Sequence, residues 1–471
     1  MYGWRLEYSS TFARSWDEVD FALGLSRFDL LAMQPHFPGY PYFILGGMMV
    51  HQWISDPVQS LSIFNVLMSA ASSIPIYLLA RNGLSKLESL FITFCIQCST
   101  YFWILTSQPM SEGSALSVLW WYLWSLYLAN KHRTWLTQIL PLFLFSILMG
   151  IRLSYFVFGV GIIYLWIKER RALQGQGYWQ RWAVYFILAI CFQLVWVTGL
   201  VMSEGSWSGF LELSFQFVKG HFTEWGGSAL SNPQPLLDRG IVLLFENFLW
   251  TGLIGQSMII ASGMVFLFIL MIIESIRFGF RIHDFRHYYG MASLLILYFI
   301  YAWFAQNIDK PRHIAPLIGP SLLLFYILIL RTRRNLRIKW GLLVMMVSVQ
   351  FFAGMTLSKE QATVSPATYQ LADHLNAIES PFLVYTWEET RVMEYLQVPY
   401  EHKRIFTYEI FMEDLLLNQG KRIFLTNAVV EGFKSQGYDV SKQIREIGQF
   451  SSNPLFDPVY HDITLYEWMI E

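Results

Sequence analysis

The sequence predicts a polytopic α-helical membrane protein with about ten spans and a small soluble α/β domain at its C-terminus. Of the 471 residues, 54% are hydrophobic and 14% are charged, and the mean hydropathy of +0.38 exceeds that of an ordinary soluble chain. Apolar runs of about 20 residues recur, which is the length a helix needs to cross a bilayer core of ~30 Å. The composition then changes abruptly after residue 357.

Ten apolar segments are candidate spans by this length criterion. They are 58–80, 88–106, 113–130, 135–150, 152–167, 182–202, 246–274, 289–306, 313–330 and 338–357. The fourth and fifth segments are short and nearly continuous. They are therefore either two spans joined at 150–152 or one long broken helix.

Along the predicted spans, loops rich in lysine and arginine alternate with loops that are poor in them. One set of alternate loops holds 16 basic residues: Arg81, Lys86, Lys131, Arg133, Lys168, Arg170, Arg171, Arg181, Arg277, Arg281, Arg286, Arg331, Arg333, Arg334, Arg337 and Lys339. Terminal regions aside, the opposite set holds five: Arg152, Lys219, Arg239, Lys310 and Arg312. Loops rich in Lys and Arg stay in the cytoplasm, so the first set faces inward. Both termini and the C-terminal domain then lie outside the cell (plasma) membrane.

An outside N-terminus needs a segment that carries it across, and residues 1–40 contain neither a signal peptide nor an apolar span. We therefore expect a native first transmembrane helix upstream of Met1. The chain divides into three regions: an outer loop with an acidic motif and a juxtamembrane helix (1–57), a transmembrane helical domain (58–357) and an extracytoplasmic α/β domain (358–471). Within the first region, the semi-apolar stretch 40–53 is too short to span and suits the membrane interface.

The C-terminal region alternates strand-like and helix-like runs. The expected strands are 382–387, 404–408, 422–426 and 463–468, and the expected helices are 388–396, 410–418 and 428–436. Strands that alternate with helices predict a compact α/β domain with a largely parallel sheet.

Charge and cysteine content exclude some classes of function. The net charge of −1 provides no general attraction to nucleic acid. The three cysteines, Cys95, Cys98 and Cys191, lie inside apolar runs, which excludes a disulfide framework. The spacing of Cys95 and Cys98 is typical of metal or redox sites, but packing within a helix explains both thiols better, since no second ligand pair accompanies them.

The first candidate site is the acidic motif formed by Asp17, Glu18 and Asp20. Carboxylates this close together repel one another, which raises at least one pKa and suits a general base or a cation site. A solvated acidic turn is the plainer interpretation. The flanking aromatic residues and the rigid Pro- and Tyr-rich stretch 34–42 favour a functional role.

Two further outer-face features carry charge. Glu112 lies where one span follows another, and it is either a functional carboxylate or a residue favoured by the helix dipole. Lys310, Arg312 and His313 form a basic cluster on a face poor in positive charge, which predicts a phosphate site. Arg152 is a second candidate for such a role, with interfacial snorkelling as its alternative.

The segment 219–228 is rich in glycine and aromatic residues. His221 and Trp225 supply the hydrogen bonding and ring stacking that are typical of sugar contacts. A structural aromatic turn explains the segment about as well.

In this order, these motifs resemble the GT-C glycosyltransferases that use lipid-phosphate sugars, such as the protein O-mannosyltransferases and the bacterial lipid A aminoarabinose transferase. The resemblance covers most of the membrane region in layout, and its specific residues are the Asp17-Glu18 pair and the Arg312-His313 pair followed by Pro316. Two features depart from the family: the span expected before the acidic pair is absent, and the α/β tail is similar only to that of some bacterial members.

The resemblance implies that Asp17 is the catalytic base, with Glu18 and Asp20 as supporting groups or as part of a metal site. It implies that Arg312, together with Lys310, binds the lipid phosphate of the donor, and Glu112 matches an acidic position that often follows the second full span. No cofactor is implied as required, and the use of a divalent cation is left open.

The function implied is inverting transfer of a sugar from a polyprenyl-phosphate donor to a hydroxyl of a lipid, glycan or protein acceptor at the outer membrane surface. Among transferases, the nearest alternative function is that of a polymerase or ligase that uses lipid-pyrophosphate glycans. Two alternatives of other classes are a polytopic transporter or flippase and a non-catalytic component of polysaccharide assembly.

Overall fold

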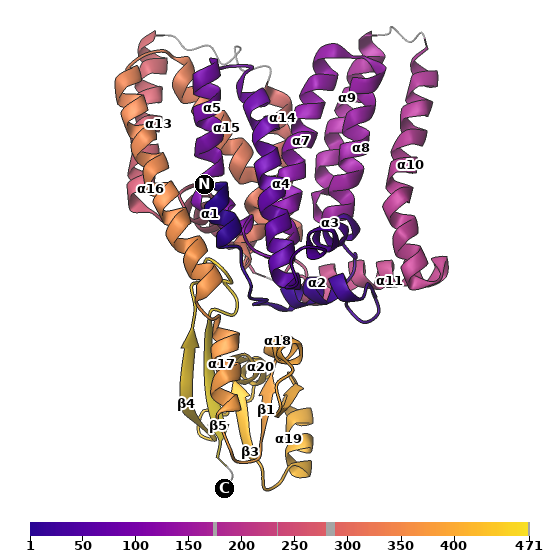
Figure 1. Ribbon diagram of the computed structural model, residues 1–471, viewed down its shortest axis with the longest axis vertical. Helices are drawn as coiled ribbons and strands as arrows, with labels where there is room; N and C mark the ends of the chain where they lie inside the picture. Colours follow the sequence, from indigo (N-terminus) through magenta and orange to yellow (C-terminus); the bar gives the residue numbers. More distant parts are fainter. Residues whose placement is uncertain (173–176, 233, 279–287, 470–471) are drawn as a thin grey trace.

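The computed structural model describes residues 1–172, 177–232, 234–278 and 288–469. A helical bundle forms one part of the molecule and a sheet-containing C-terminal domain forms the other (Figure 1). Arg281 and Arg286 of the predicted inward loops lie outside the described residues. The helix ends at the other basic loops lie at the end of the bundle away from the C-terminal domain (Figure 1).

Helices occupy each of the ten predicted ranges. The bundle consists of α4 (Pro57–Ala80), α5 (Lys86–Gln97), α6 (Thr100–Leu105), α7 (Ser111–His132), α8 (Trp135–Ile151), η1 (Leu153–Gly159), α9 (Val160–Ala172), α10 (Tyr178–Glu204), α13 (Met258–Phe278), α14 (Tyr289–Ala305), α15 (Ala315–Arg331) and α16 (Leu336–Thr363). Within the described part of the chain, five helical segments are long and apolar enough to cross a membrane: Pro57–Ala80, Tyr178–Glu204, Met258–Phe278, Pro311–Arg331 and Leu336–Asn376. The chain is thus an integral membrane protein, and the count of ten spans stays a prediction.

Two predicted spans are interrupted. The range 88–106 is divided between α5 and α6, and the range 246–274 is divided between the π-helix η3 (Val242–Leu253) and α13. The second break has a local cause, because Gly255 and Gln256 both have positive φ angles, 62° and 57°. Two successive left-handed residues cannot continue a right-handed helix.

The region around 150–152 forms two helices rather than one broken helix. Helix α8 ends at Ile151, and Arg152 follows in an extended conformation (φ −154°, ψ 104°) before the 3₁₀ turn η1 begins. Helix α9 then packs against α7 and α14. This bend places Arg152 at the end of the bundle that faces the C-terminal domain.

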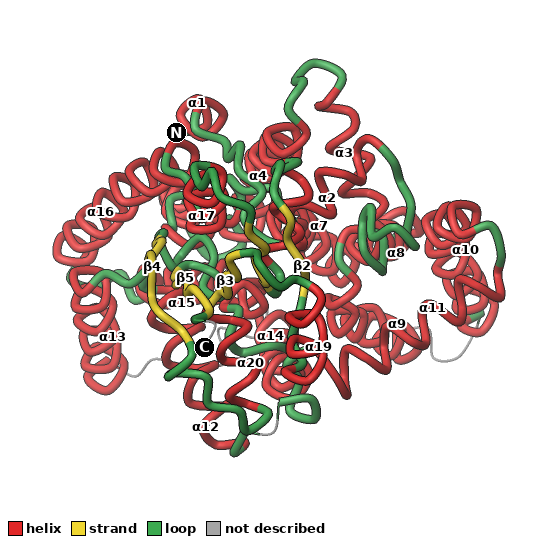
Figure 2. Tube along the Cα trace, turned by 90° about the horizontal axis from the view of Figure 1, so that it is seen from below, coloured by secondary structure: helices red, strands yellow, loops and turns green. Residues whose placement is uncertain are grey.

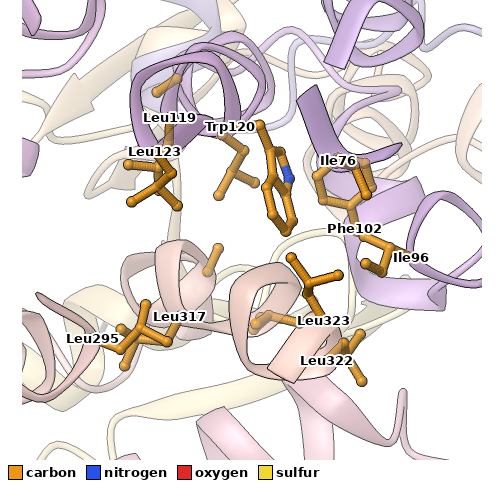
Figure 3. Packing of buried hydrophobic residues seen from close by; sticks show 14 of the residues in the cluster. Ile76, Ile96, Phe102, Leu119, Trp120, Leu123, Leu295, Leu317, Leu322 and Leu323 are labelled. Carbon is orange, nitrogen blue, oxygen red and sulfur yellow. The ribbon is translucent and has the colours of Figure 1, made fainter. Parts of the chain in front are cut away.

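Side-chain caps and a dense apolar core stabilise the bundle. The Asp56 carboxylate accepts a hydrogen bond from the Gln59 amide at the start of α4, and Ser85 and Glu88 form a reciprocal capping box on α5. Side chains of α4, α5, α6, α7, α14 and α15 interdigitate in the core (Figure 3). Trp120 of α7 is one of the largest of these buried side chains.

A layer of short helices lies between the bundle and the C-terminal domain (Figure 1). It contains α2 (Trp16–Ser26), α3 (Pro41–His51) and α11 (Trp207–Gly220), which continues into the π-turn η2 (His221–Trp225). Helix α1 (Tyr2–Glu7) instead packs against α4 and α16, and α12 (Leu236–Ile241) continues into η3. Helix α3 occupies the stretch expected at the interface. Seen from the C-terminal side, α10 and α11 lie at one edge of the molecule and α13 and α16 at the other (Figure 2).

Helix α16 links the bundle to the C-terminal domain without a flexible linker. Its 28 residues correspond to about 42 Å at 1.5 Å per residue, which exceeds the ~30 Å of a bilayer core. After Val364 the chain continues within three residues into α17 (Ala367–Asn376).

The C-terminal domain contains a five-stranded sheet in the order β2-β1-β3-β5-β4. The elements are β1 (Phe382–Thr386), α18 (Glu389–Leu396), β2 (Glu401–Arg404), α19 (Tyr408–Leu417), β3 (Arg422–Thr426), α20 (Asn427–Ser435), β4 (Ile444–Ser451) and β5 (Asp462–Trp468). Strand β1 is buried on both faces: Leu383 and Tyr385 pack with Phe411 of α19, whereas Phe382 and Val384 pack against the α17 side.

The predicted largely parallel sheet is only half right. Strands β2, β1 and β3 are parallel, but β5 is antiparallel to β3 and β4 is antiparallel to β5. Strand β2 ends at Arg404, where the prediction 404–408 began. Strand β4 and helix α17 were not expected. Strand β4 is a largely exposed edge strand with a bulge between Glu446 and Gly448, so it has no continuous apolar pattern.

Candidate functional site

The acidic motif forms the start of α2, and each of its carboxylates faces a different cation. Asp17 and Glu18 lie in the first turn, where the helix dipole favours negative charge. Separate partners relieve the mutual repulsion expected from their spacing. The three side chains therefore enter three different environments.

Asp17 faces the loop that precedes α15. Its Oδ2 atom accepts a hydrogen bond from Nη2 of Arg312 at 2.7 Å, and the His36 Nε2 atom lies 3.8 Å from Oδ1. About a third of the Asp17 side chain remains exposed, so a ligand can reach it.

Burial acts to raise the pKa of Asp17, but nearby positive charges outweigh that effect and hold the pKa below its ordinary value. The groups that lower it are His36, Arg312, Lys310 and Arg152. Asp17 is therefore ionised and ready to accept a proton, although its basicity is weakened in this state.

Glu112 lies in the first turn of α7 and is completely buried. Its Oε1 atom lies 2.9 Å from Arg152 Nη2 and 3.1 Å from Arg312 Nε. The helix dipole alone does not account for this position, because Glu112 bridges two guanidinium groups. Asp17, Glu112, Arg152 and Arg312 thus form one charged cluster built from α2, α7, the α8–η1 bend and the turn before α15.

Arg152 is held inside this charged cluster rather than extending to the interface. Besides its ion pair with Glu112, its Nη1 atom donates a hydrogen bond to Ser111 Oγ at 2.8 Å. Only 11% of its side chain is exposed. The snorkelling interpretation therefore does not fit its position.

The three basic residues of the loop before α15, Lys310, Arg312 and His313, differ in their contacts. Arg312, in the 3₁₀ turn η5 (Pro311–Ile314), binds both Asp17 and Glu112. His313 contacts its own loop, with Nδ1 3.1 Å from the Asn307 carbonyl. Within the described residues, the Lys310 amino group forms no ion pair or hydrogen bond, although its charge acts on Asp17.

His221 and Trp225 form the π-turn η2 at the edge of the charged cluster. Their rings meet edge to face with centroids 5.4 Å apart, and Trp225 is 55% exposed. Burial lowers the pKa of His221, and the positive charge of Arg152 lowers it further. The turn therefore lies within electrostatic reach of the charged cluster, with an aromatic surface open to a ligand.

Glu18 points away from Asp17, toward the N-terminal segment and the C-terminal domain. Its Oε2 atom accepts a hydrogen bond from the Arg14 amide at 2.5 Å. Burial raises the pKa of Glu18 to about 7 although the positive charge of Arg14 opposes the shift. Arg14 also lines a cavity of about 640 Å³ between the bundle and residues 451–456 of the C-terminal domain.

Asp20 is fully buried and lies one helical turn beyond Asp17. Its Oδ2 atom is 3.0 Å from His36 Nδ1, and its Oδ1 atom is 2.8 Å from Arg391 of the C-terminal domain. The His36 Nε2 atom also lies 3.1 Å from the Tyr40 hydroxyl.

No motif in the sequence singled out His36, Tyr40, Arg14 or Arg391 as a site residue. The Pro- and Tyr-rich stretch 34–42 was the signal for the first two. No local pattern marks Arg391, since its role depends on a contact between residues 371 positions apart.

The described residues contain no group of three or more His, Cys, Asp and Glu side chains placed to hold a metal ion. Arginine side chains instead neutralise the carboxylates of the charged cluster. The arrangement is thus suited to binding an anion beside a carboxylate base.

Solved structures with the same fold include ArnT from Cupriavidus metallidurans bound to undecaprenyl phosphate. It matches with a TM-score of 0.53 at 10% identity, over 98% of this chain and 96% of that chain, and its apo state gives the same values. The apo oligosaccharyltransferase of Archaeoglobus fulgidus matches with a TM-score of 0.48 at 12% identity, over 87% of this chain and 65% of that chain.

No family model matches the sequence, and no curated protein matches it. The match to ArnT, at 10% identity over nearly the whole length of both chains, shows a shared fold. It confirms the fold that the resemblance implies.

Proposed function

We propose that this chain is a membrane glycosyltransferase that moves a sugar from a polyprenyl-phosphate donor to an acceptor hydroxyl at the outer face of the membrane. The observation that carries the proposal is the convergence of Asp17, Glu112, Arg152 and Arg312 from four separate segments. The fold shared with ArnT, solved with undecaprenyl phosphate bound, supports the choice of donor.

The charge balance of the site favours a phosphate. Two carboxylates face two arginines, and Lys310 adds a further positive charge that no described residue neutralises. Guanidinium groups bind phosphate oxygens through paired hydrogen bonds, and an ammonium group adds a point charge. The charged cluster therefore has capacity for one more anionic group.

In the proposed reaction, the acceptor oxygen attacks the anomeric carbon while Asp17 takes the proton from that oxygen. The bond between the anomeric carbon and the phosphate oxygen breaks, and its electron pair leaves with the polyprenyl phosphate. Arg312 and Lys310 stabilise the charge that grows on the leaving group. Attack opposite the leaving group inverts the anomeric configuration.

The exposed aromatic turn at Trp225 supplies a sugar contact in this proposal. The C-terminal domain lies on the same side as the charged cluster (Figure 1). Because the basic loops lie at the opposite end, we propose that this domain lies outside the cell.

The transporter alternative has less support. Ion-coupled transporters place ionisable groups at mid-membrane depth. Within the described part of the bundle, the buried carboxylates all lie within five residues of a helix end: Glu88, Glu112, Glu169 and Glu274. A non-catalytic component has no need of a partly exposed carboxylate paired with a largely buried arginine.

The test uses the full chain in lipid nanodiscs with undecaprenyl-phosphate aminoarabinose or undecaprenyl-phosphate mannose, and a cell-envelope extract as the source of acceptor. We expect release of undecaprenyl phosphate with one donor, and a product whose anomeric configuration by NMR is opposite to that of the donor. No release with either donor, but release from an undecaprenyl-pyrophosphate glycan, would replace the donor class. Retention of configuration would exclude the direct displacement by the acceptor.

A further inference from the structure

The C-terminal domain reaches the acidic motif through one buried carboxylate. Asp20 is fully buried, and both of its oxygens are engaged. One oxygen lies 2.8 Å from Nε and Nη2 of Arg391 in α18, and the other lies 3.0 Å from Nδ1 of His36. Three segments distant in sequence therefore meet at this carboxylate.

His36 connects Asp20 to the charged cluster. A proton on Nδ1 donated to Asp20 leaves Nε2 facing the Tyr40 hydroxyl at 3.1 Å and Asp17 at 3.8 Å. A carboxylate that binds one imidazole nitrogen fixes the orientation of the ring and the atom presented by the other nitrogen. Asp20 thus acts on Asp17 indirectly, through the orientation of the His36 ring.

Arg391 contacts both segments that carry these groups. Its Nη2 atom donates to the carbonyl of Met33 at 3.2 Å, three residues before His36. Its guanidinium carbon lies 5.5 Å from the centroid of the Trp16 ring, the residue before Asp17. Loss of this cation would leave the buried Asp20 without its positive partner, which is a strongly unfavourable state.

We propose that Arg391 is a positioning residue for the transfer reaction, acting through Asp20 and His36 on Asp17. The inference rests on the proposed function, in which Asp17 is the base. The C-terminal domain then contributes to turnover by holding the base in place, without itself touching the donor. Its docked position is a condition for full activity.

Arg404 provides a matched control for simple docking of the domain. Its guanidinium carbon lies 4.8 Å from the Trp16 centroid and 4.0 Å from that of Trp387. It therefore joins the same domain to the same helix, but it makes no contact with Asp20. A purely structural role for the interface predicts similar losses from both arginines.

The experiment measures turnover of the undecaprenyl-phosphate sugar and the Kd for undecaprenyl phosphate, in nanodiscs, for Arg391→Ala, Arg391→Lys and Arg404→Ala. We expect Arg391→Ala to lower kcat by about 10- to 100-fold, the scale of a displaced reacting group, with Kd unchanged within about twofold. Arg391→Lys restores part of the rate, since it keeps the charge, and Arg404→Ala stays close to the parent chain. Equal losses from Arg391→Ala and Arg404→Ala overturn the proposal.

A double variant tests whether the effect passes through His36. We expect Arg391→Ala to add little loss once His36→Ala is present, because the link is already broken. Losses that multiply show that the two residues act independently and overturn the link. If Arg391→Ala fails to fold, Asp20→Asn tests the same link with a side chain of the same shape.

The Asp17→Asn variant distinguishes failure of the proposed function from failure of the positioning role of Arg391. Full activity of Asp17→Asn removes the proposed base and this inference with it. Loss of activity in Asp17→Asn together with normal kcat in Arg391→Ala leaves the proposed function standing and overturns the positioning role alone.

Discussion

Nη2 of Arg312 lies 2.7 Å from Oδ2 of Asp17, a contact that joins positions 295 residues apart. In the proposed reaction one of these groups binds the donor phosphate and the other removes a proton. In the structure these two groups contact each other. Arg312 meets Asp17 through Nη2 and Glu112 through Nε, so a donor phosphate at Arg312 would share this guanidinium group with Asp17.

This shared arginine couples donor binding to the strength of the base. The positive charge of Arg312 is one of the influences that hold the pKa of Asp17 down. A phosphate that neutralises this charge lets the pKa of Asp17 rise, and a carboxylate with a higher pKa is a stronger base. Asp17 then gains basicity when the donor is in place.

Replacement of Asp17 by Asn is expected to lower turnover by about 10²- to 10⁴-fold, the usual contribution of a general base. The isosteric amide keeps the shape of α2, so the melting temperature in detergent should change little. Initial rates of undecaprenyl phosphate release provide the measurement. Asp238→Asn, an exposed carboxylate on α12, is the control and should keep the parent rate.

Replacement of Arg312 by Ala is expected to weaken binding of undecaprenyl phosphate by about 10- to 100-fold, the loss typical of one charge-assisted contact. Arg312→Lys should recover only part of the affinity, because lysine lacks the planar fork of donors. Titration of undecaprenyl phosphate into nanodiscs measures both. Arg27→Ala, at an exposed ion pair with Asp29, should bind as the parent does; an unchanged Kd in Arg312→Ala removes Arg312 from the phosphate site.

Replacement of Glu112 by Gln is expected to destabilise the fold as well as the site. The change leaves Arg152 without its carboxylate, and breaking a buried ion pair costs about 3–5 kcal/mol. Glu274→Gln breaks the buried pair with Lys339 near the opposite end of the bundle and is the matched control. Both variants should melt earlier in detergent, but only Glu112→Gln should also weaken binding of undecaprenyl phosphate.

The raised pKa of Glu18 predicts that the stability of the fold depends on pH. Its pKa in the folded chain is about 7, above the ordinary value of 4.5, so the folded state binds more protons than the unfolded state between these values. Stability contributed by this group is therefore full below about pH 4.5 and is lost as the pH rises to 7, by ~3 kcal/mol.

The measurement is the melting temperature of the parent chain and of Glu18→Gln in detergent at pH 5 and pH 8. The difference between the two chains isolates Glu18 from the other titrating groups. We expect the parent chain to lose more stability than Glu18→Gln between pH 5 and pH 8. Parallel curves would show that folding does not raise the pKa of Glu18.

Predictions that rest on local pattern agree best with the structure. Apolar length located the helices of the bundle, and continuous apolar runs located β1 and β3 at the residues where they occur. The break at Gly255 and Gln256 was missed because the flanking sequence is apolar on both sides, and hydropathy does not indicate backbone conformation. The edge strand β4 was missed because its exposed residues follow no apolar period.

For the charged cluster, the sequence indicated candidate groups but not their partners. Lys310, Arg312 and His313 were expected to act together, whereas the fold binds Arg312 to Asp17 and turns His313 toward Asn307. The difference arises because an ion pair between distant segments depends on helix packing. The same reason hid Arg391, which is an ordinary surface arginine by sequence alone.

Because α16 is long, the thickness of the bilayer affects the position of the C-terminal domain. Only three residues outside helix separate the 28-residue α16 from α17. The height of the C-terminal domain above the lipid therefore depends on the tilt of α16. A thinner bilayer increases helix tilt, and a thicker one decreases it. Membranes of different acyl-chain length should therefore shift the domain relative to α2, and we expect lipid composition to change the contacts between the two.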